Sequence, residues 1–130
     1  MPKYLLFLVA LLWTVIVAYF CLIKSSDIPV INIPNLDKCI HVFFHFVFTF
    51  VWFLFFRKQI QTDNFQNPLL YSFILSFVFG ITIEILQELV TTTRSADIFD
   101  VLANLTGALV TVFTVFICNK LNILNSIFKD

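Results

Sequence analysis

Charged residues are scarce in this chain. Asp, Glu, Lys and Arg make up 12% of its 130 residues, whereas hydrophobic residues make up 60%. A soluble domain usually carries about 25% charged residues, and the mean hydropathy of this chain is +0.97. The shortage of charge therefore excludes an ordinary soluble domain and indicates an integral membrane protein.

The chain also lacks a net charge and the common chemical motifs. Its formal net charge is zero, which argues against a nucleic-acid partner and against a polybasic lipid-surface binder. Cys21, Cys39 and Cys118 have no metal-binding or redox spacing, so we expect free thiols. Neither a Gly-x-Ser-x-Gly motif nor a His-Glu-x-x-His motif occurs. The sequence therefore names no nucleophile and predicts no cofactor.

Long hydrophobic runs are what the chain does have. Each is close to the ~20 residues that a helix needs to cross a bilayer. Helices are expected because open sheet edges are too costly in lipid and four strands cannot close a barrel. The sequence predicts an all-α integral membrane protein, a four-transmembrane-helix bundle in one domain over residues 1–130. The expected helices are 4–23, 39–56, 69–90 and 100–118, followed by a short interfacial helix within 120–130.

The connections and the basic residues suggest an orientation. Residues 25–36 contain two prolines and are expected to form an extended loop, and Pro68 is expected to open the third helix. The first run is too long for a signal-peptide core and lacks a cleavage site, so we expect a retained helix. With both termini in the cytoplasm, five basic residues lie inside and three outside, as the positive-inside rule prefers. The five are Lys3, Arg57, Lys58, Lys120 and Lys129.

Ionisable side chains interrupt the hydrophobic runs. Glu84 and Asp100 lie in or beside them, where a charged group costs roughly 2.5–3.5 kcal/mol on insertion scales. Glu84 is expected about 9 Å from the outer end of its helix, at a rise of ~1.5 Å per residue. Polar residues at three- and four-residue steps form stripes on three helices, which are expected to face one another at the outer side. The stripes are Lys38, His41, His45 and Thr49; Ser72, Ser76, Gly80, Glu84 and Gln87; and Asp97, Asp100, Asn104, Gly107 and Thr111.

The same residues carry a family resemblance. The sequence contains Asp37-Lys38-x-x-His41, then Gly80-x-x-x-Glu84-x-x-Gln87, then Arg94-x-x-Asp97-x-x-Asp100-x-x-x-Asn104-x-x-Gly107. In order and spacing, over about residues 37–110, these motifs resemble the VanZ-like family. The resemblance implies a small bacterial integral membrane protein linked to resistance to the glycopeptide teicoplanin. Two positions depart from the family pattern: His45 replaces a common aromatic, and Thr111 replaces a common glycine, which is expected to loosen helix packing.

The polar residues lead to several functional hypotheses. The first is an outward-facing pocket that binds an anionic or amphipathic ligand, such as a membrane lipid or a lipid-linked cell-wall precursor, with Arg94 and Lys38 holding the anionic group. The pocket residues would be Asp37, Lys38, His41, Glu84, Gln87, Arg94, Asp97, Asp100 and Asn104. The second is an intramembrane hydrolase or transferase acting on such a lipid, with Glu84 or His41 as general base and Asp100 orienting it.

Other interpretations remain open at this point. Arg94, Asp97 and Asp100 also fit an interfacial ion-pair cluster in which Asp97 or Asp100 caps the fourth helix. A metal site built from His41, His45, Glu84 and Asp100 is the less favoured alternative, and the sequence predicts no metal. A transporter is disfavoured because polar groups gather at one end of the expected bundle. The sequence leaves open whether the protein forms a homodimer.

Overall fold

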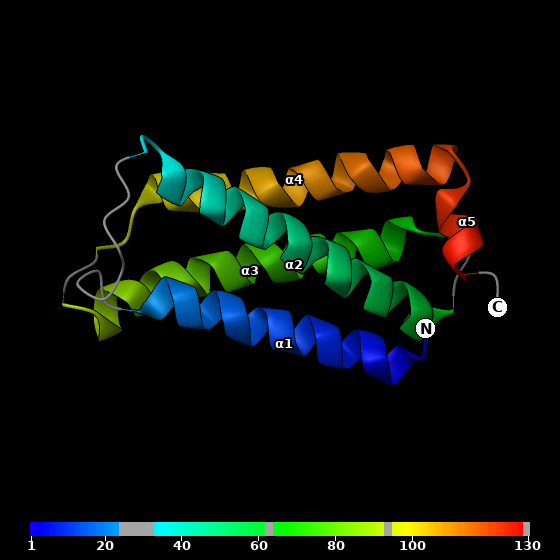
Figure 1. Ribbon diagram of the computed structural model, residues 1–130, viewed down its shortest axis with the longest axis horizontal. Coiled ribbons are helices and arrows are strands. Elements are labelled where there is room, and N and C mark those ends of the chain that lie inside the picture. The colour runs from blue at the N-terminus through cyan, green and yellow to red at the C-terminus, as the bar shows by residue number, and fades with distance from the viewer. Residues whose placement is uncertain (24–32, 62–63, 93–94, 129–130) are drawn as a thin grey trace.

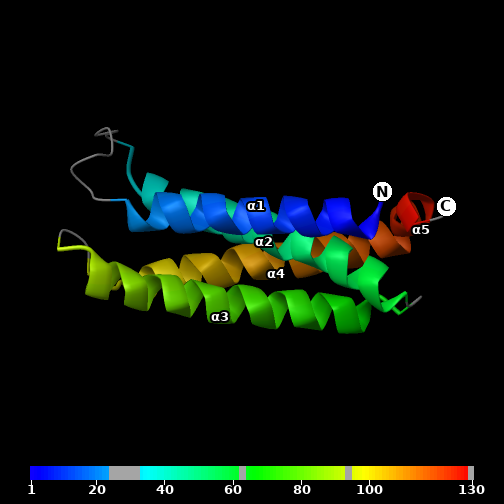
Figure 2. The ribbon, with the colours of Figure 1, turned by 90° about the horizontal axis from the view of Figure 1, so that it is seen from below.

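The computed structural model describes residues 1–23, 33–61, 64–92 and 95–128, and its ordered elements are all helices. Four long helices run side by side as a bundle, with the Lys3 end of α1 and the short α5 at the same end (Figures 1 and 2). The predicted all-α fold is confirmed. The elements are α1 (Lys3–Leu22), α2 (Leu36–Ile60), α3 (Gln66–Val90), α4 (Ile98–Lys120) and α5 (Ile123–Phe128).

The four long helices have the length and composition of membrane spans. The shortest has 20 residues, which corresponds to a length of ~30 Å and matches the hydrocarbon core of a bilayer. Large apolar side chains are exposed along all four helices, including Tyr4, Phe43, Val78 and Phe113. Such surfaces are stable only against lipid, so the chain is a multi-pass membrane protein.

The helices extend beyond the hydrophobic runs that predicted them. Helix α2 begins at Leu36 and ends at Ile60, rather than spanning 39–56, because its polar end turns remain helical. Asp37 lies in its first turn, and Arg57 and Lys58 lie in its last turn. At these positions each charge interacts favourably with the helix dipole. Helix α4 likewise exceeds the expected 100–118.

The third helix also starts earlier than expected. It begins at Gln66, so Pro68 does not open it but lies within its first turn. Proline is tolerated there because the first backbone N–H groups of a helix have no intrahelical partner. The expected loop over 25–36 lies mostly outside the described residues. Within the described part, Asn35 precedes α2 in a left-handed conformation with φ of 57°.

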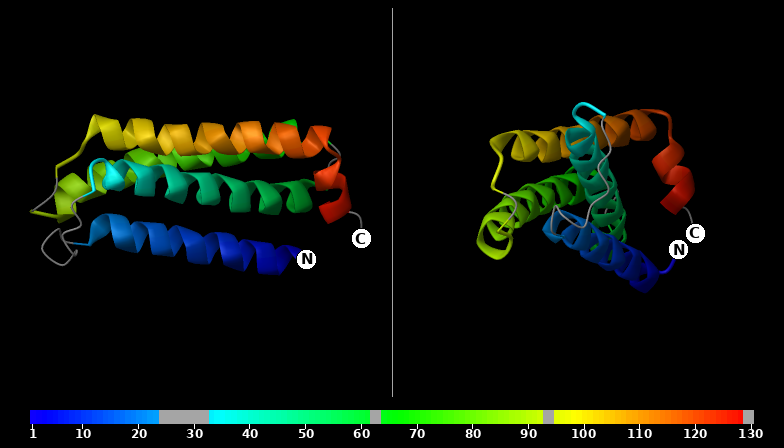
Figure 3. Two further views of the ribbon diagram at one scale, coloured as in Figure 1. Left: turned by 45° about the horizontal axis from the view of Figure 1, so that its top comes forward. Right: turned by 60° about the vertical axis from the view of Figure 1, so that its left-hand side comes forward.

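Helix α2 is the centre of the bundle and packs against α1, α3 and α4 (Figure 3). Its contact with α4 is close: a Cβ on Gly107 would lie 2.2 Å from the Val42 carbonyl oxygen and 2.9 Å from the Phe46 nitrogen. Thr111 is fully buried and donates a hydrogen bond of 2.8 Å to the Phe46 carbonyl oxygen. Instead of loosening the packing, this hydroxyl links α4 to α2, as small polar residues do in membranes.

The apolar packing continues toward α5. Phe53, Leu69, Val115 and Leu124 form one buried cluster, and Leu124 is only 1% exposed. Leu124 therefore anchors α5 at the end of the bundle where α2 and α4 end and α3 begins.

Candidate functional site

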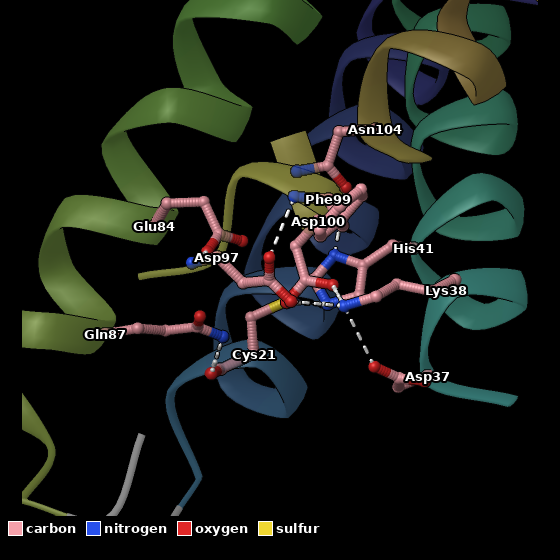
Figure 4. Close-up of polar contacts among 10 residues, drawn as sticks. All are labelled: Cys21, Asp37, Lys38, His41, Glu84, Gln87, Asp97, Phe99, Asp100 and Asn104. Carbon is pink, nitrogen blue, oxygen red and sulfur yellow. Dashed lines mark hydrogen bonds and ion pairs between the residues drawn. The ribbon is translucent and has the colours of Figure 1, made fainter. Parts of the chain in front are cut away.

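The candidate site lies where α2 and α4 begin and α3 ends (Figure 4). We call it the polar cluster: Asp37, Lys38, His41, Glu84, Asp97, Asp100 and Asn104. Its members come from α2, α3 and α4 or its N-cap, and Lys38 and His41, like Asp100 and Asn104, are three or four residues apart, which places each pair on one helix face. His41, Glu84, Asp100 and Asn104 are each at most 6% exposed, so the cluster reaches into the bundle.

Lys38 lies among three carboxylates. Its ammonium nitrogen is 2.7 Å from Asp97 Oδ2 and 3.1 Å from Asp37 Oδ2, and it also donates to Asp100 Oδ1. A lysine ammonium has three N–H donors, and this geometry directs all of them to carboxylates. The contact joins the first turn of α2 to the start of α4.

Asp97 caps α4, one of the two positions that the sequence suggested for this role. Its Oδ1 accepts a hydrogen bond of 2.8 Å from the Phe99 backbone nitrogen, which satisfies one of the free N–H groups at the helix start. The Lys38 ammonium, first of all, and this backbone donor lower the pKa of the Asp97 carboxyl. Asp97 therefore stays charged and holds α4 and Lys38 together.

His41 is held in one orientation by α4. Its Nδ1 is 2.9 Å from Asn104 Oδ1. An amide oxygen only accepts hydrogen bonds, so the His41 Nδ1 is the donor in this contact. That Nε2 is 3.7 Å from Asp100 Oδ2. The imidazole therefore turns its Nε2 toward the Asp100 carboxylate.

Glu84 reaches the cluster from α3. Its side chain is 3% exposed, and its Oε2 accepts a hydrogen bond of 3.3 Å from the Asp97 backbone nitrogen. The start of a helix carries a partial positive charge that favours a carboxylate there. Ligating atoms of Glu84, His41 and Asp100 all lie within 4.8 Å of one another. The three helices thus bring two carboxylates and one imidazole to a common point.

Two further residues were predicted for the site, Gln87 and Arg94. Gln87 is buried, but its Nε2 donates a hydrogen bond of 2.6 Å to the Cys21 carbonyl oxygen. Gln87 therefore fastens α3 to the end of α1, and sequence reasoning missed this partner because a backbone carbonyl leaves no sequence signal. Arg94 lies outside the described residues.

The two histidines of α2 have different surroundings. His45 Nδ1 is 2.8 Å from Ser76 Oγ, and its ring centroid lies 5.9 Å from that of Phe48. The four-residue metal set that included both histidines is not assembled. Within the described part of the chain, the side chains that lie close enough together to hold a metal ion are those of His41, Glu84 and Asp100. His45 is a hydrogen-bonded residue of the packed interior.

An apolar groove borders the polar cluster on the outer surface of α2. It has a volume of about 390 Å³, and its lining is almost entirely apolar. Lys38 belongs both to this lining and to the polar cluster. The groove is lined by Asn35, Lys38, Cys39, Val42, Phe43, Phe46 and Val110.

Comparison with known proteins identifies the family. No curated protein and no solved structure that was compared with this chain matches it. A family model described as VanZ/LLP1 matches residues 4–119, which includes all four long helices and the whole polar cluster. The chain is therefore a member of the VanZ/LLP1 family.

Proposed function

We propose that this protein is a bacterial cytoplasmic-membrane protein that binds an amphipathic ligand, either a membrane lipid or a lipid-linked cell-wall precursor. The observation that carries the proposal is the position of Lys38. Its side chain is shared by the polar cluster and the apolar groove. A headgroup at Lys38 would continue into an acyl chain along Val42, Phe43 and Phe46, which is the arrangement that an amphipathic molecule requires.

The charge of the cluster constrains the headgroup. Three carboxylates, those of Asp37, Asp97 and Asp100, contact Lys38, and a fourth, Glu84, accepts from the Asp97 backbone. These acids would repel an anionic headgroup unless the headgroup replaced one of them in its contact with Lys38. Arg94 would supply a second cation for such a headgroup. We therefore favour a ligand that pairs an anionic group with hydroxyl or ammonium donors, because the carboxylates accept hydrogen bonds from those donors.

We propose that the cluster faces away from the cytoplasm. Lys3, Arg57, Lys58 and Lys120 belong to the opposite end of the bundle (Figure 1), and basic residues favour the cytoplasmic side. Both termini would then be cytoplasmic, and the ligand would enter from the outer leaflet. This location fits a role in susceptibility to teicoplanin, a glycopeptide that acts on the cell wall, as the family resemblance implies.

The proposal is tested by ligand-dependent thermal stability of the purified full chain in detergent. Anionic lipid, zwitterionic lipid and a lipid-linked precursor are added separately to the wild type, Lys38→Met and Val110→Trp, which fills the groove. We expect at least one ligand to raise the Tm of the wild type and to have little effect on either variant. Lys120→Met and Ile117→Trp are matched controls, because both residues are exposed and lie away from the site. Equal shifts in the wild type and both site variants would contradict the proposal.

A cellular experiment tests the link to the antibiotic. The gene is expressed in a susceptible bacterial host, and the teicoplanin concentration that stops growth is compared for wild type, Glu84→Gln and Lys120→Met. We expect wild type and Lys120→Met to raise this concentration equally and Glu84→Gln to raise it less. No difference between the wild type and an empty vector would remove teicoplanin from the proposed function.

A further inference from the structure

The interior of the polar cluster has the composition of a metal site. His41, Glu84 and Asp100 come from α2, α3 and α4 and are 5%, 3% and 6% exposed. The two carboxylates lie close to the imidazole and to each other, and Lys38 binds one of them, Asp100. We propose that these three side chains bind one divalent metal ion, in contrast to the expectation of no metal drawn from the sequence. The proposal does not depend on the apolar groove or on lipid binding.

The spacing of the three side chains supports a shared ion. His41 Nε2 and Asp100 Oδ2 are 3.7 Å apart, which is too long for a hydrogen bond. Two ligands of one tetrahedral ion, each at ~2.0–2.2 Å from the metal, lie roughly 3.4 Å apart. The third ligand, Glu84, has an oxygen within 4.8 Å of both partners. A small inward movement of side chains therefore completes the coordination.

Each proposed ligand is also held by a second partner. Asn104 Oδ1 accepts the Nδ1 proton of His41, which leaves Nε2 as the metal-binding atom. Lys38 binds Asp100 Oδ1, so that Oδ2 is the oxygen that faces His41. Glu84 Oε2 accepts from the Asp97 backbone. Such outer partners, which fix the tautomer and the direction of each ligand, accompany most protein metal sites.

A second observation points to an occupant of this space. Asn104 Nδ2 is buried and has no hydrogen-bond partner among the described residues. Asn104 as a whole is 3% exposed, and its amide nitrogen lies on the side that faces Glu84 (Figure 4). A buried amide donor without an acceptor is costly. A water molecule bound to the metal would accept its hydrogen bond.

The donor set indicates which metals would bind. One imidazole and two carboxylates suit Zn²⁺ or Mn²⁺, whereas Mg²⁺ and Ca²⁺ prefer sites made only of oxygen. Three protein ligands leave at least one coordination position open, as in catalytic zinc sites. The Lys38 ammonium opposes cation binding by repulsion.

The test is direct metal binding by the full chain in detergent. The protein carries no polyhistidine tag and has Cys39→Ser in every variant, because Cys39 is exposed and thiolates are zinc ligands. After treatment with EDTA, Zn²⁺, Mn²⁺ and Mg²⁺ are titrated by calorimetry. We expect one Zn²⁺ or Mn²⁺ ion per chain and an affinity loss of more than about 100-fold in His41→Gln and Asp100→Asn. Asn104→Leu, which removes an outer partner, should lose about 10–100-fold.

His45→Gln is the matched control, since His45 is a buried histidine of the same helix that contacts Ser76 instead. It should bind the metal as the wild type does. Equal affinity in wild type and His41→Gln, or the absence of Zn²⁺ and Mn²⁺ binding by the wild type, would overturn the proposal. If His41→Gln fails to fold, pulsed EPR of Mn²⁺ bound to wild-type protein with ¹⁵N-labelled histidine decides the matter. A histidine nitrogen coupling supports the site, and its absence refutes it.

Discussion

The two ends of the bundle carry opposite kinds of polar groups. At one end, the carboxylates of the polar cluster surround Lys38 and His41. At the other end, the guanidinium of Arg57 lies 4.5 Å from the ring centroid of Phe128 and borders a surface pocket of about 750 Å³. The described residues that line this pocket are mostly amides and aromatics, among them Asn119, Asn122 and Asn125.

Acidic and basic side chains are therefore separated along the bundle axis. Acidic groups gather where α2 and α4 begin, and basic groups gather where α1 begins and α2 and α4 end. For α2 and α4, whose first turns are acidic and last turns basic, these charges interact favourably with the helix dipole. Gly107 lies against the backbone of α2, and Gly80 lies against Asn104 and His45, so both glycines allow close packing beside the buried part of the polar cluster. The opposite end carries the surface pocket instead.

The largest expected effect comes from removing the close approach itself. Gly107→Val would place side-chain atoms against the Val42 carbonyl oxygen, which a Cβ alone would approach to 2.2 Å. Since backbone atoms cannot move aside cheaply, we expect a loss of about 3 kcal/mol or more, or no folded protein. Thermal unfolding and yield in detergent measure this, with the exposed Leu109→Val on the same helix as control. Unchanged stability of Gly107→Val would contradict the α2–α4 geometry.

Removing one lysine from each end would sharpen the contrast between them. Lys38→Met, in protein freed of metal, leaves three carboxylates without their shared cation. Because Lys38 is partly exposed, we expect a loss of about 1–3 kcal/mol, below that of a fully buried pair. Lys120→Met at the opposite end should change the unfolding free energy by less than about 0.5 kcal/mol. Equal effects in chemical denaturation would show that the two ends do not differ as described.

The acidic end should also lose stability in acid. The pKa of Asp97 is lowered from its ordinary value of 3.8, mainly by Lys38. A depressed carboxyl pKa contributes stability that is present above the unfolded value and is lost as the pH falls through the folded value. We therefore expect Tm to fall more steeply below pH ~4 in the wild type than in Asp97→Asn.

Asp97→Asn separates charge from capping, because asparagine is also a good helix N-cap. Asp97→Ala removes both and should lower the Tm further than Asp97→Asn at neutral pH. An acid response of Asp97→Asn as steep as that of the wild type would mean that other carboxyls dominate this end.

The smallest expected effect lies between the two ends. Thr111 donates to the Phe46 carbonyl oxygen of α2, whereas Thr114 donates to the Val110 carbonyl oxygen of its own helix. Thr111→Val should therefore cost about 0.6–1.7 kcal/mol, the range of hydrogen bonds between membrane helices. Thr114→Val, measured in the same unfolding assay, should be nearly neutral. A larger effect at Thr114 would contradict the assigned partners.

Much of the fold could be predicted from the sequence, and the parts that could not be predicted have physical causes. Hydropathy located four spans but ended them early, because the turns that contain Asp37 and Arg57 remain helical without being apolar. Three- and four-residue steps predicted which side chains share a helix face. The same periodicity could not separate His41 from His45, since both occupy one stripe. Their partners, Asn104 and Ser76, depend on how α3 and α4 pack against α2.

The sequence by itself determined that this protein is a membrane bundle with polar faces on three helices, because hydrophobicity and helical periodicity are local properties of the chain. Only the tertiary structure decided which of those polar groups meet. It directed the Lys38 ammonium to three acids, tied Gln87 to a backbone carbonyl of α1, and drew His41, Glu84 and Asp100 to one point. Rotation and spacing of packed helices set these contacts, and both depend on atoms far apart in the chain.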